Sequence, residues 1–131
     1  MGNATLVGPN LEAGRELIKA LDASGLDVRA AFWFYREESE EWRMYIATPL
    51  VKEQGPREAY SRILNALRKN SIHSIDLSNI SVIDPTDGLA TVLSLAIANG
   101  PHINEISFNG ETVNGVYIRA AYIYRMNIRP S

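Results

Sequence analysis

Apolar and other residues alternate with a two-residue period in three stretches, 28–35, 42–47 and 116–126, and these stretches limit the folds open to the chain. Successive side chains of a β-strand point to opposite faces of a sheet, so this period predicts strands rather than helices. The polar residues 37–41 separate the first two stretches and predict a turn. A sheet with a hairpin near its start is therefore the framework of the expected fold.

Helical patterns lie between these strands. Apolar residues recur at helical spacing from the capping residue Asn10 to Gly25, after Gly55-Pro56, and again after Asp84–Asp87. Adding a third strand within 72–83 and a strand after residue 101, we expect the order α-β-β-α-β-α-β-β. This order predicts an α+β two-layer sandwich, with a mostly antiparallel sheet of about five strands and helices mainly on one face.

The length of 131 residues is that of one domain, so we expect a single domain over 1–131 with a loose N-terminal arm at 1–9. Two Asn-Gly pairs, Asn109-Gly110 and Asn114-Gly115, are both suited to the turn of the last hairpin. The sequence does not choose between them.

Composition excludes several classes of chemistry. The chain has no cysteine, which removes disulfides, thiolate catalysis and cysteine-ligated metals, and its two histidines give no expectation of a metal or cofactor. A net charge of −2 weighs against nucleic acid as a partner. No apolar run reaches the roughly 20 residues of a membrane span, and no signal peptide precedes the first helix, so we expect a cytoplasmic protein without a membrane partner.

Arginine and aromatic residues alternate along the strands, and this alternation predicts that they share a single sheet face, opposite the core face. Such a face could bind a second copy of the chain or another protein, an anion, or single-stranded nucleic acid. It could also be an ordinary outer face on which arginine stems cover the rings. The candidate residues are Arg29, Trp33, Tyr35, Arg43, Tyr45, Tyr117, Arg119 and Arg125.

A second candidate site lies near the start of the third helix, where Asp84, Thr86 and Asp87 could bind a ligand or take part in acid–base chemistry with His73. The same acids are also well placed to cap the helix. His73 and Asp76 are three residues apart, which puts them on opposite faces of a strand rather than in a dyad.

Residues 75–89, IDLSNISVIDPTDGL, resemble the strand-to-helix segment of STAS domains, the anti-sigma-factor-antagonist family. The likeness covers this segment alone, and the chain has one residue more than the family pattern at the helix start. The resemblance implies a protein-binding domain switched by phosphorylation, with Thr86 as the phosphate acceptor.

Motifs of common nucleotide-binding proteins and hydrolases are absent, such as Gly-x-Gly-x-x-Gly, Gly-x-Ser-x-Gly and His-Glu-x-x-His. Together with the arginine and aromatic residues, this favours a small non-catalytic binding or protein-interaction module that self-associates. The alternatives are a small-ligand binder or enzyme at 84–87 and single-strand nucleic-acid binding on the sheet.

Overall fold

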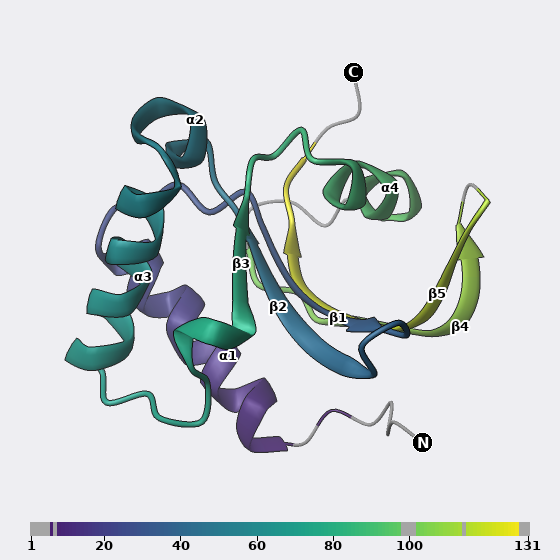
Figure 1. Cartoon of the computed structure of the whole chain (residues 1–131), viewed down its shortest axis with the longest axis horizontal. Helices are drawn as coiled ribbons and strands as arrows, with labels where there is room; N and C mark the ends of the chain where they lie inside the picture. Colours follow the sequence, from purple (N-terminus) through teal and green to yellow (C-terminus); the bar gives the residue numbers. More distant parts are fainter. Residues whose placement is uncertain (1–5, 7, 98–101, 114, 129–131) are drawn as a thin grey trace.

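The computed structural model describes residues 6, 8–97, 102–113 and 115–128. Most of the predicted arm, residues 1–5 and 7, lies outside these residues. The elements in chain order, shown in Figure 1, are α1 (Gly8–Ala23), β1 (Ala30–Arg36), β2 (Glu41–Ala47), α2 (Leu50–Gln54), α3 (Pro56–Lys69), the short 3-10 helix η1 (Leu77–Asn79), β3 (Ile80–Ile83), α4 (Gly88–Ala96), β4 (Ile106–Val113) and β5 (Val116–Met126).

The five strands form one sheet in the order β3-β2-β1-β5-β4. Only β2 and β3 run parallel; the other neighbours are antiparallel. This confirms the predicted α+β class, the order of elements and the mostly antiparallel sheet. Val113 pairs with Val116, so the strands of the last hairpin are joined between these two residues rather than at Asn109-Gly110.

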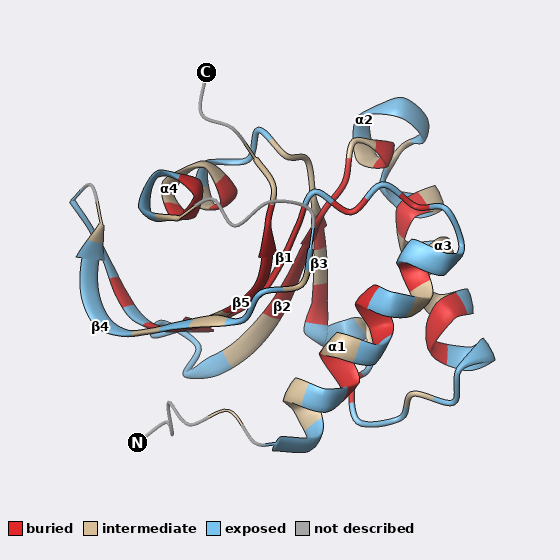
Figure 2. Cartoon of the chain, turned by 180° about the vertical axis from the view of Figure 1, so that it is seen from behind, coloured by how far each residue is buried: buried red, intermediate tan, exposed pale blue. Residues whose placement is uncertain are grey.

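Helices α1 and α3 cover one face of the sheet (Figure 1). Their apolar stripes meet the strands in a core where Leu17, Ile18, Ile63, Trp33 and Met44 are almost fully buried. Figure 2 shows the buried side of both helices turned towards the sheet and the exposed side turned towards solvent. The two long helices thus form the layer that the sequence predicts.

Helix α4 lies on the opposite side, in the hollow of the curved sheet (Figure 1). Leu93 of α4 joins a second cluster with Phe32, Tyr45, Ile118 and Ile123. Asp87 caps this helix, because its side chain accepts a hydrogen bond from the backbone amide of Leu89 at 3.0 Å. The sheet therefore has a buried cluster on both faces.

Candidate functional site

The strand register does not place the predicted arginine and aromatic residues on one face. Trp33 pairs with Met44, and Phe32 pairs with Tyr45, so Trp33 and Tyr45 point to opposite sides of the sheet. The turn between Arg36 and Glu41 sets this register, in which each odd-numbered residue of β1 shares a face with an even-numbered residue of β2. The predicted alignment of the strands was off by one residue and is wrong.

Half of the candidates also lie in the interior. The exposed fractions are 1% for Trp33, 4% for Tyr35, 9% for Tyr45 and 6% for Arg125. The indole Nε1 of Trp33 donates a hydrogen bond to the Tyr124 hydroxyl at 3.0 Å. Tyr35 packs edge-to-face on Trp42, with ring centroids 5.5 Å apart. These side chains hold the layers together.

Arg125 is buried because the register shifts near its end of β5. Ala31 pairs with Arg125 and Phe32 pairs with Ile123, which leaves Tyr124 without a partner on β1. As a result both Tyr124 and Arg125 contact α1. The guanidinium of Arg125 binds the carboxylate of Asp22 with two hydrogen bonds, of 2.7 and 2.9 Å, and also donates to the carbonyl of Val28.

Two other candidate arginines bind within the chain. Arg29 forms a 2.8 Å ion pair with Asp27. Arg43 donates to the Ser81 hydroxyl at 2.5 Å and to the Ser78 carbonyl at 3.1 Å, and so links β2 to η1 and β3. Of the predicted surface, Tyr117 and Arg119 are exposed without such bonds among the residues that the structure describes.

Tyr117 and Arg119 line a groove of about 450 Å³ between the start of α4, the β1–β2 turn and the start of β5. We call it the α4 groove. Tyr45 lines it as well, and its ring stacks on Phe32 at 5.3 Å and meets the edge of Phe34 at 6.5 Å. The apolar and aromatic lining includes Phe34, Tyr45, Ile83, Leu89 and Val116, with Tyr117 beside them.

Charges of both signs border the α4 groove. Glu37 and Glu38 lie in the β1–β2 turn, and Asp87 lies at the start of α4. Arg36 reaches Glu38 at 4.0 Å, whereas Arg119 forms no ion pair with any described residue. The groove therefore combines an aromatic floor with an acidic side and an arginine that is free to bind.

Helix α4 has an unusual composition for a surface helix. Its nine residues, GLATVLSLA, include no charged side chain. Large hydrophobic residues that are exposed in the described part of the chain are Leu95 of α4, at 52%, and Val116 and Tyr117 of the groove, at 39% and 51%. A helix that is apolar on most sides is usually covered. The absence of charged residues from 88–96 can be read from the sequence, and it is a separate signal from the apolar stripe that predicts the helix.

The residues of the second predicted site do not all lie together in the structure. Thr86 donates to the Asp84 carboxylate through its hydroxyl and its amide, and Lys52 of α2 forms a 3.5 Å ion pair with Asp84. Partial burial raises the pKa of Asp84, but the hydrogen bonds from Thr86 and the charge of Lys52 outweigh it and hold that pKa below its ordinary value. These contacts give Asp84 a role in holding the turn before α4.

The remaining members of that site lie apart from one another. Asp87 lines the α4 groove while it caps α4, and His73 lines a separate hollow with Ile75 and Leu77. Among the described residues no group of three His, Asp or Glu side chains could hold a metal ion. No helix in the described ranges is long and apolar enough to span a membrane.

No protein-family model matches this chain, and neither a curated protein nor a solved structure matches it. The resemblance of residues 75–89 to STAS domains is thus confined to that segment. In the structure its helix begins at Gly88, and the Thr86 hydroxyl is bonded to Asp84. The candidate site therefore stands on its own geometry.

Proposed function

We propose that this chain is a non-catalytic interaction module that associates with a second copy of itself through the α4 face, meaning α4 together with the α4 groove. The observation that carries the proposal is the uncharged helix α4 at the surface, beside a groove with exposed Val116 and Tyr117. Burying apolar surface stabilises an interface by about 25 cal/mol per Å². Apolar and aromatic side chains exposed at a groove are common at interaction sites.

The charges around the α4 groove favour a second copy as the occupant. In a two-fold symmetric dimer the same patch contributes both partners of every contact. The acidic side formed by Glu37 and Glu38 can then meet Arg119 of the other copy, and the reverse contact forms at the same time. A patch that carries both signs can be self-complementary in this sense.

The sheet edges are a poorer route to self-association. Edge strand β4 contains Gly110 at a φ of +71°, which interrupts its extended backbone. Edge strand β3 is four residues long. Short or irregular edges resist pairing with another chain. The α4 face is thus the surface best suited to a partner.

Local chemistry supports binding rather than catalysis. Asp87 uses a carboxylate oxygen to cap α4, and Asp84 is bonded to Thr86 and Lys52. A general base needs a carboxylate or imidazole that faces a bound substrate. Asp84 is held by its neighbours, and one oxygen of Asp87 is used in the cap.

Amide hydrogen exchange at several protein concentrations tests the proposal. We expect the amides of α4 and of 116–119 to exchange more slowly as concentration rises, because association covers them. The amides of α3, on the other face of the sheet, provide the internal control. Exchange at the α4 face that is independent of concentration while the protein stays monomeric would contradict the proposal.

A further inference from the structure

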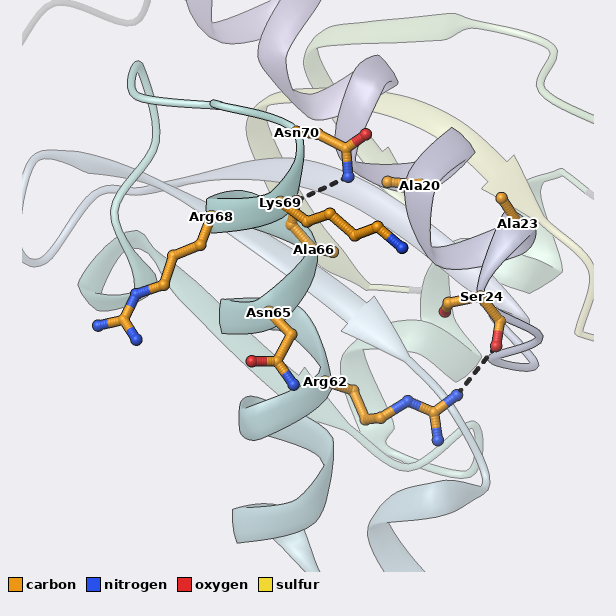
Figure 3. Close-up of a pocket in the computed structure, with 9 residues that line it drawn as sticks. All are labelled: Ala20, Ala23, Ser24, Arg62, Asn65, Ala66, Arg68, Lys69 and Asn70. Carbon is orange, nitrogen blue, oxygen red and sulfur yellow. Dashed lines mark hydrogen bonds between the residues drawn. The ribbon is translucent and has the colours of Figure 1, made fainter.

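A second groove lies on the other side of the sheet, between the C-terminal halves of α1 and α3 (Figure 3). Its volume is about 700 Å³, which is within the range of small-molecule sites. Ala20 and Ala23 of α1 face Ala66 of α3 across it, so the groove is bounded by small apolar side chains. We call it the basic groove, because basic side chains of α3 line it.

Three basic side chains of α3, Arg62, Arg68 and Lys69, line this groove, and no carboxylate does. Figure 3 shows Arg62 and Lys69 reaching across towards α1. Within the described part of the chain none of the three forms an ion pair, whereas Arg15 and Arg125 do. A chain with a net charge of −2 thus concentrates unpaired positive charge in one groove.

Two polar contacts position the lining. Arg62 donates to the carbonyl of Ser24 at 3.4 Å, which holds its guanidinium at the end of α1. That contact uses one of five guanidinium N–H groups, so others remain for a ligand. Asn65 lies between Arg62 and Lys69 along the same wall and adds a neutral donor and acceptor.

The end of α3 does not account for these basic residues. Cations in a last turn often satisfy the free carbonyls of a helix. Here the carbonyls of Ala66, Leu67 and Arg68 accept hydrogen bonds from the backbone amides of residues 70–72, and the Asn70 side chain also donates to Ala66. Arg68 and Lys69 therefore keep their donors for another acceptor.

We infer that the basic groove binds a small phosphate ester. Guanidinium groups bind phosphate oxygens with paired, charge-assisted hydrogen bonds, and the ammonium of Lys69 adds a point charge. The alanine side chains and Asn65 suit the uncharged organic part of such a ligand. The site is on the α1–α3 layer, so the inference is independent of association through the α4 face.

Binding of AMP, adenosine and inorganic phosphate, measured by calorimetry at low ionic strength, tests this inference. Low salt is needed because exposed charges are screened over about 10 Å at 0.1 M. We expect AMP to bind at least about tenfold more tightly than adenosine, which lacks the phosphate, and than inorganic phosphate, which lacks the organic part. AMP binding no tighter than either probe would overturn the inference.

A pair of matched variants locates the binding. Arg62→Ala with Lys69→Ala removes the two cationic side chains that reach across the groove towards α1, and we expect AMP affinity to fall at least about tenfold. Little stability should be lost, because the bond from Arg62 to the Ser24 carbonyl is long and exposed. The control, Arg57→Glu, changes the net charge by the same two units at an exposed residue of α3 outside the groove and should leave the affinity unchanged. Equal losses in both variants would show a general charge effect and overturn the inference.

Discussion

Tyr124 of β5 occupies the space that a side chain at Gly14 of α1 would need. A Cβ at residue 14 would come within 2.8 Å of the ring carbon that carries the Tyr124 hydroxyl. The hydroxyl accepts a hydrogen bond from Trp33 at 3.0 Å and donates to the carbonyl of Leu11 at 2.7 Å. Close approach of α1 to the sheet therefore depends on the missing side chain.

Gly14→Ala should lower the free energy of unfolding by about 1–3 kcal/mol, because an extra methyl group in a filled core forces neighbours to move. Denaturant unfolding measures this loss. Gly8→Ala, in the first turn of the same helix, adds a Cβ with nothing within 4 Å and should be nearly neutral. Equal stability of the two variants would show that α1 does not depend on a close approach of Gly14 to Tyr124.

Asp22→Asn should lower the free energy of unfolding by about 2 kcal/mol, because it removes the charged partner of the buried Arg125. Thermal unfolding checks the effect. The matched change Asp27→Asn breaks an ion pair with Arg29 in which both side chains are largely exposed, and it should cost no more than about 0.5 kcal/mol. A smaller effect at Asp22 than at Asp27 would refute the assignment of Arg125 to the interior.

Glu105 links the segment before β4 to α1, because it accepts hydrogen bonds from Arg15 and from the Tyr122 hydroxyl. The bond from Arg15 lowers the pKa of Glu105 below its ordinary value of 4.5, although burial acts in the opposite direction. The folded state therefore favours the carboxylate. Its contribution is complete above pH 4.5 and is lost as the pH falls through the lower folded pKa.

Glu105→Gln should therefore reduce the free energy of unfolding by about 0.5 kcal/mol at neutral pH, a value limited by solvent screening. The difference from the unmodified protein should shrink as the pH falls below 4.5 in a series of urea titrations. Glu16→Gln, a change at an exposed residue of α1 without an ion pair among the described residues, serves as the control. A difference at Glu105 that grows with acid would contradict this assignment.

Much of the fold follows from local patterns in the sequence. The alternation in 28–35, 42–47 and 116–126 predicts β1, β2 and β5, because successive side chains of a strand point to opposite faces of a sheet. Both faces are covered over much of these strands, so buried residues follow one another in β1 and in the second half of β2. Capping residues and glycines predict the helices. Helix α2 was missed, since Leu50–Gln54 is too short for a periodic signal.

The candidate site was harder to predict because it depends on register. Shifting the pairing of two strands by one residue moves every side chain of one strand to the other face. The turn between Arg36 and Glu41 and the irregularity near Tyr124 set that register, and neither is encoded in the alternation itself. The sequence nevertheless selects Tyr117 and Arg119, because they are an aromatic residue and an arginine two positions apart on one strand. This part of β5 is paired with β4 and lies beyond the pairing with β1.

The basic groove also could not be predicted from local patterns in the sequence. Arg62, Arg68 and Lys69 look like an ordinary solvated helix face when α3 is considered alone. Only the packing of α1 beside α3 turns that face into the wall of a groove. The groove therefore could not be predicted from the sequence pattern of α3, because it depends on contacts between helices that are distant in the sequence.

The solution mass, measured by light scattering, tests self-association through the α4 face most directly. We predict a dimer for the unmodified chain and a folded monomer for Val116→Glu with Tyr117→Glu, because each change places a carboxylate in the exposed apolar part of the α4 groove. Gln54→Glu with Ser61→Glu adds the same charge at exposed positions of α2 and α3 and should remain a dimer. A monomer for the unmodified chain at high concentration, or a dimer that persists in the Val116/Tyr117 variant, would contradict the account.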